Sequence, residues 1–219
     1  IIVALGGLVS CASVEREAPA SATVEASSME SIETASETNV LTDAAELYRS
    51  GNTAAAIGLV SRSLEDLSGE DRVSALLLLA NLYMTEGDGA AARNRLNQIL
   101  EQDSGHIEAR FLLAMLARSD GDVQKSQALL QEIISIYPNY APAYVAIGEQ
   151  LLAEREYSEA KESFARAVEI DAVNYFALAG LGNALIFLKE YEPAVEQLTA
   201  AIELRPNQAY AYSDRARAY

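Results

Sequence analysis

The chain has 219 residues, half of them hydrophobic, no Trp and a formal net charge of −16, a composition that favours helix and argues against binding the phosphate backbone of nucleic acids. Its single cysteine, Cys11, and single histidine, His106, argue against an internal disulfide, a thiolate metal cluster or a histidine-based site. We therefore predict no metal and no cofactor, and expect His106 to be a solvated loop residue.

The chain begins with an apolar run that ends at its only cysteine. Residues 1–10, IIVALGGLVS, are too few for a membrane-spanning helix, which needs about 20 apolar residues. Their length suits the apolar core of a secretory signal. Because an initiator Met and a basic start are absent, we interpret residues 1–10 as a partial signal peptide and the sequence as a fragment.

The residues Leu8-Val9-Ser10-Cys11 resemble the lipobox of bacterial lipoproteins. The resemblance implies that Cys11 becomes the first mature residue and carries acyl chains, two or more of which anchor a protein stably. Ala12 rather than Asp after the cysteine implies retention at the outer membrane, facing the periplasm. The alternatives are an ordinary signal peptide or a buried thiol.

We predict that residues 11–38 consist of the lipidated Cys11 and a linker. The stretch after Cys11 has no aromatic residue, is rich in Ser, Thr and Ala, and contains six Glu. Its apolar positions follow neither a helical nor a strand period, so it offers no face to bury. We predict a disordered acidic linker with a typical span of roughly 30 Å. A partner-binding tail is the alternative.

From residue 39 to residue 219 the sequence repeats with a period of 34 residues. Small residues recur in two series, and large apolar residues recur in a third. The first small series is Ala80, Ala114, Gly148, Gly182 and Ala216. The second small series is Ala92, Ser126, Ala160 and Ala194, and the large series is Leu96, Leu130, Phe164 and Leu198. We expect the small residues of the two series to face each other and let helix axes approach to about 8–10 Å.

The period and residue types resemble the tetratricopeptide repeat, in which each unit is a pair of antiparallel helices. The resemblance implies an all-α, right-handed α-solenoid over residues 39–219, with about five units and the start of a sixth. Because the last unit is half complete, we expect the C-terminus to be truncated. Gly51, Gly87 and Gly121 stand at the turns between paired helices.

The sequence departs from the family pattern at two places. Ile99 and Ile133 stand where the family prefers Ala, and Arg155 and Lys189 replace the turn Gly. We therefore expect the first three units to pack less closely than the fourth and fifth.

In this family the first helices line a concave groove. The resemblance implies that the groove binds protein or peptide segments, as an amphipathic helix or an extended apolar stretch. The alternative is that these side chains pack against the neighbouring repeat. The predicted groove residues are Leu77, Asn81, Met84, Phe111, Met115, Arg118, Val145, Glu149, Phe176, Asn183 and Phe187.

No phosphate-binding Gly loop, metal-ligand cluster or nucleophile–base pair is visible, so we predict that the chain is not an enzyme. The favoured function is a scaffold that binds segments of bacterial envelope proteins and meets the membrane only through its lipid anchor. The alternative is the N-terminal repeat region of a larger protein whose enzymatic or other domain lies beyond Tyr219.

Overall fold

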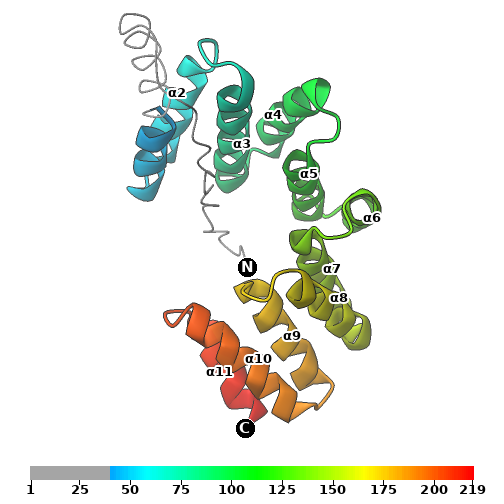
Figure 1. Ribbon diagram of the computed structural model, residues 1–219. Helices are drawn as coiled ribbons and strands as arrows, with labels where there is room; N and C mark the ends of the chain where they lie inside the picture. The colour runs from blue at the N-terminus through cyan, green and yellow to red at the C-terminus, as the bar shows by residue number, and fades with distance from the viewer. Residues whose placement is uncertain (1–39) are drawn as a thin grey trace, which may run out of the picture. The chain divides into compact units, whose positions relative to one another are not determined.

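The structure is a computed structural model that describes residues 40–219, and within this range it contains helices and no strands (Figure 1). The predicted all-α repeat fold is confirmed. The predicted signal peptide, the lipidated Cys11 and the acidic linker lie outside the described residues.

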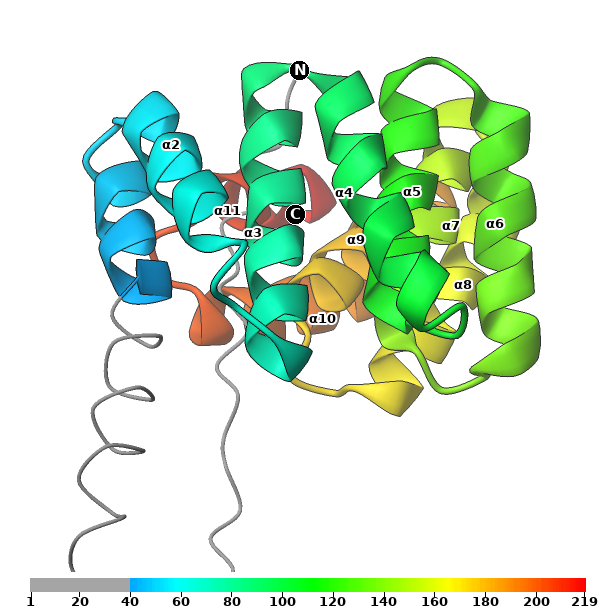
Figure 2. The ribbon, with the colours of Figure 1, turned by 90° about the horizontal axis from the view of Figure 1, so that it is seen from above.

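The described residues form one compact unit in which the helices follow one another as antiparallel pairs. A helix over residues 40–49 pairs with the first labelled helix. The labelled helices are α2 (Thr53–Ser63), α3 (Gly69–Glu86), α4 (Gly89–Gln102), α5 (Ile107–Ser119), α6 (Val123–Ile136), α7 (Ala141–Glu154), α8 (Tyr157–Ile170), α9 (Tyr175–Phe187), α10 (Tyr191–Leu204) and α11 (Ala209–Ala218). Each helix packs mainly on the helices before and after it, as Figure 2 shows from above.

Polar residues fix where several helices begin. The side chains of Asp88 and Asp122 accept hydrogen bonds from the backbone N–H three residues later, at 2.9 and 3.0 Å. Such bonds satisfy a donor that the first turn of a helix leaves free. His106 does the same for α5, since its Nδ1 accepts from the N–H of Ala109 at 3.3 Å. His106 lies in the connection before α5, as predicted, but it is a half-buried helix cap rather than a solvated residue.

The turns inside the helix pairs use the left-handed backbone conformation throughout. Gly51, Gly87 and Gly121 have φ of 82°, 79° and 84°, as expected for turn glycines. Arg155 and Lys189 occupy the same position in the fourth unit (α7 and α8) and the fifth unit (α9 and α10), with φ of 66° and 64°. A side chain in this conformation costs roughly 1–2 kcal/mol, so these two turns are strained.

The core lies along the seams between helices. The large residues Leu96, Leu130, Phe164 and Leu198 are essentially fully buried. The nearest side chain to Gly148 is that of Phe164, since a Cβ at Gly148 would lie 2.8 Å from its ring. A Cβ at Gly180 of the next unit would meet the same ring more closely still. The Phe164 ring therefore fits between α7 and α9 because both helices carry glycine there.

Candidate functional site

The predicted groove residues all lie on the first helices of consecutive units, α3, α5, α7 and α9. Within the described unit, α3, α5 and α7 follow the inner side of an arc, and α4, α6 and α8 follow its outer side (Figure 1). We call the eleven predicted positions the inner face. Its members differ in how far they are available to a partner.

Eight of the eleven residues keep accessible surface. Asn81, Glu149 and Phe187 are exposed, and five others are half-buried: Leu77, Met84, Phe111, Arg118 and Phe176. The remaining three are buried, with 7% of Met115, 9% of Val145 and 8% of Asn183 accessible. These three side chains contribute to packing between helices. The sequence pattern did not distinguish such buried positions from accessible ones.

An ion pair crosses the inner face between α5 and α7. Arg118 Nη1 donates to Glu149 Oε2 at 2.8 Å, and the two side chains are 34% and 42% exposed. An ion pair this exposed contributes about 0–1 kcal/mol to stability. The sequence predicted both residues as groove residues but not their pairing, because the 31-residue separation has meaning only once the helices are stacked. The pair neutralises the centre of the inner face.

The aromatic residues of the inner face make ring contacts with neighbouring units. Phe111 meets Tyr140 edge to face at 5.7 Å between centroids, and Phe187 stacks on Tyr157 at 4.5 Å. Burial, followed by the nearby charge of Glu108, raises the pKa of Tyr140 to about 12. These rings therefore combine partial exposure with a fixed orientation, since each has a packed neighbour.

Arg205, which follows α10, lies against the aromatic residues that begin α9. Its guanidinium is 5.2 Å from the ring centroid of Tyr175 and 5.0 Å from that of Phe176. Cation–π contacts at such distances are attractive and hold both partners in place. Sequence reasoning placed Phe176 in the groove but gave no role to Arg205.

A polar cluster joins α9 to α11, and its members Asn183 and Asp214 are buried. Asn183 donates through Nδ2 to the hydroxyl of Tyr210, and Arg217 donates to Asp214 Oδ1 at 2.9 Å. Asn183 Oδ1 and Asp214 Oδ2 have no hydrogen-bond partner among the described residues. Burial, and then the charge of Asp214, raises the pKa of Tyr210. Sequence analysis missed Asp214, because an acid in a helix is usually a surface residue.

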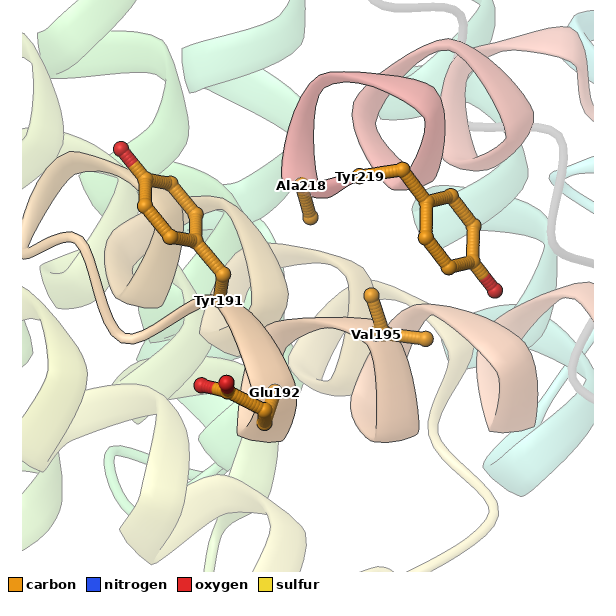
Figure 3. A pocket seen from close by; sticks show the side chains of 5 residues that line it. All are labelled: Tyr191, Glu192, Val195, Ala218 and Tyr219. Atoms are coloured by element: carbon orange, nitrogen blue, oxygen red, sulfur yellow. The ribbon is translucent and has the colours of Figure 1, made fainter.

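One pocket lies where the start of α10 meets the end of α11. It encloses about 340 Å³ and is lined by Tyr191, Glu192, Val195, Ala218 and Tyr219 (Figure 3). None of the predicted site residues lines it.

Over residues 40–219, no three His, Cys, Asp or Glu side chains gather closely enough to hold a metal ion. In the same part of the chain, no helix combines the length and the hydropathy needed to cross a membrane. The accessible chemistry of the inner face is therefore apolar contact and hydrogen bonding by amides, beside a neutralised ion pair.

Comparison with solved structures supports the fold. A thermophilic TPR protein from Thermus thermophilus superposes with a TM-score of 0.65 at 20% identity, over 83% of this chain and 98% of that chain. A tetratricopeptide repeat protein from Parabacteroides merdae gives 0.59 at 16% identity, over 84% and 72%. MamA gives 0.54 at 23% identity, over 76% and 96%. At these identities the likeness shows the fold alone.

Among curated proteins, the chain is 29% identical over 119 residues to the mouse Protein O-mannosyl-transferase TMTC3. That match covers 52% of this chain and 12% of the mouse protein, so the chain corresponds to a small part of that relative. Family models described as tetratricopeptide repeat match residues 47–116, 83–150, 141–174 and 177–208. Because these matches cover most of the helical array, the chain belongs to the tetratricopeptide repeat family.

Proposed function

We propose that the chain is a non-enzymatic scaffold that binds a segment of a partner protein along its inner face. One observation carries the proposal: accessible apolar side chains recur on three of the four first helices, as Leu77 and Met84 on α3, Phe111 on α5, and Phe176 and Phe187 on α9. Apolar surface that recurs along one side of a repeat array is typical of an interaction surface.

The partner segment is apolar and largely uncharged. Although the whole chain has a net charge of −16, the ion pair Arg118–Glu149 neutralises the middle of the inner face, and α9 contains no charged residue. An amphipathic helix or an extended stretch with its apolar side chains toward the inner face fits this surface. We therefore expect binding that changes little with salt concentration, because screening acts on charges.

A pair of photo-crosslinking positions tests this proposal. A crosslinker at Asn81, exposed on the inner face, is compared with one at Asn97, exposed on the outer helix α4. We expect one partner segment to be captured through position 81 and not through position 97. The captured segment is then made as a peptide and titrated against the purified chain.

Substitution of Met84 by Glu should weaken binding of that peptide at least about tenfold, because a charge would be buried without a partner. The matched substitution Asn97→Glu should leave the affinity unchanged. Equal capture from both helix faces, or full affinity of the Met84→Glu variant with an unchanged circular dichroism spectrum, would refute an inner-face binding site.

The chain is, in this proposal, tethered to the outer membrane through lipid on Cys11 and faces the periplasm, where envelope proteins are its partners. The support is the sequence Leu8-Val9-Ser10-Cys11 behind an apolar run. Cys11→Ser should abolish fatty-acid labelling and release the protein from the membrane fraction. Ala12→Asp is the control: it should keep the label but move the protein to the inner membrane. Unchanged labelling of Cys11→Ser would exclude this anchor.

A second candidate function is that these repeats present substrates or partners to another domain of a longer protein. The match to 12% of the mouse protein favours this alternative. The full reading frame decides between the scaffold function and this alternative. Several hundred residues of non-repetitive sequence after Tyr219 would make the scaffold one domain of a larger protein.

A further inference from the structure

The seams on the two sides of α7 are filled differently. At the seam of α8, the Phe164 ring lies between Gly148 of α7 and Gly180 of α9. At the seam of α6, the equivalent residue 34 positions earlier is Leu130, and the equivalent glycine positions hold Ala114 and Ala146. Leu130 and both alanines are buried in one small cluster. The α6 seam thus contains an aliphatic side chain where the α8 seam contains an inserted ring.

The apolar core is not continuous through α7. One cluster of buried side chains runs from Ala141 and Val145 of α7 through α8, α9 and α10 to α11. The cluster that contains Leu130 is separate and smaller, and it includes Ala143 and Ala146 from another side of α7. The direct contact of α6 with α7 is also less extensive than that of α8 with α9. The α6–α7 junction therefore buries less apolar surface.

Polar contacts also hold this junction. Gln150 of α7 donates to the hydroxyl of Ser126 on α6 at 2.8 Å, and both side chains are buried. The equivalents of Ser126 in the next two units are Ala160 and Ala194. On the inner face the junction is spanned by the exposed ion pair Arg118–Glu149. Water can replace polar contacts at small net cost, whereas withdrawing a ring from its site exposes apolar surface.

From these differences we propose that the array bends at the α6–α7 junction, so that the inner face consists of two rigid halves whose separation varies. The ion pair Arg118–Glu149 is the contact that opens on bending. One half carries Leu77, Met84 and Phe111, and the other carries Phe176 and Phe187. The inference goes beyond the scaffold function, because the bending is a property of the chain alone.

Two pairs of spin labels on equivalent exposed positions test the hinge in the full chain with Cys11→Ser. Labels at Ala128 and Glu162 span the α6–α7 junction, and labels at Glu162 and Glu196 span the α8–α9 junction. Both pairs are 34 residues apart and share one label site. We expect the distance distribution of the first pair to be roughly twice as wide, as for a hinge between rigid bodies. Equal widths would overturn the proposal.

Transferring the α8 seam to α6 should lock the hinge. The triple variant Leu130→Phe, Ala114→Gly and Ala146→Gly should narrow the first distribution to the width of the second. The two glycine substitutions without Leu130→Phe should not narrow it. A folded triple variant that keeps the wide distribution would contradict the role of the seam.

Glu149→Gln keeps the side-chain shape but removes the charge at an exposed site. We expect it to widen the first distribution and leave the second unchanged, and added salt near 1 M to act in the same direction because it screens the ion pair. If the triple variant does not fold, Glu149→Gln still tests whether the array bends at the α6–α7 junction. No widening would exclude Arg118–Glu149 as the contact that opens.

Discussion

The fourth and fifth units of the array are packed around glycine, whereas the second and third are packed around alanine. Gly148 and Gly182 contact the large residues Phe164 and Leu198 so closely that a Cβ on either would lie within 3 Å of them. The equivalent residues of the earlier units are Ala80 and Ala114, beside Leu96 and Leu130. One repeat pattern thus gives two kinds of seam, and the sizes of facing side chains decide which kind forms.

Helix α9, which lies in the units packed around glycine, is buried on most of its sides. Ten of its 13 residues are buried, and it carries no charge. A helix that is apolar on all sides must be surrounded by protein, and α9 has α7, α8, α10 and α11 around it. The C-terminal half of the array is therefore closer to a globular core than the N-terminal half is.

The largest difference between the two seams should appear on truncation. Phe164→Ala should lower the free energy of unfolding by about 4 kcal/mol, because it empties the space between two helices. Leu130→Ala should cost about 2–3 kcal/mol, since less volume is removed. Urea denaturation followed by circular dichroism measures both. Equal losses would mean that the two seams are equivalent.

Adding one methyl group should distinguish a filled seam from an open helix surface. Gly180→Ala places a Cβ inside contact distance of the Phe164 ring and should cost about 2–3 kcal/mol of stability. Gly58→Ala is the matched control, because a Cβ in the middle of α2 meets nothing within 4 Å, and it should raise stability by about 0.5–1 kcal/mol. The two melting temperatures should therefore move in opposite directions.

The junction between α5 and α7 should respond to high pH through Tyr140, whose pKa is raised from 10.0 to about 12 in the folded chain. The unfolded chain releases this proton first, so stability should fall as pH rises from about 10 towards 12, by about 2 kcal/mol. Tyr140→Phe keeps the ring and should remove this part of the pH dependence. An unchanged pH profile in the variant would assign the loss to other groups.

The smallest effects are expected at the strained turns of the tightly packed units. Arg155→Gly and Lys189→Gly should each raise the free energy of unfolding by about 0.5–1 kcal/mol, because glycine adopts positive φ without strain. Gly121→Ala, at the same turn of the third unit, should lower stability by a similar amount. Destabilisation by Arg155→Gly would show that its side chain contributes more than its backbone costs.

Much of the fold could be predicted because its signals are local. The 34-residue spacing, the turn glycines and the series of small and large residues place the helix pairs without any knowledge of the third dimension. The inner face was harder to predict. Family positions located eleven residues on the correct helices, but Met115, Val145 and Asn183 lie inside, since burial depends on the size of residues in the next unit.

The amino-acid sequence by itself determined the number, pairing and order of the helices, because each amphipathic hairpin specifies its own boundaries and must cover its apolar side with the next. Only the tertiary structure decided that one Phe164 ring contacts glycines from two units, that Arg118 meets Glu149, and that Asp214 is buried. These contacts depend on the distances between stacked helix axes, and those distances follow from the packing of several units together.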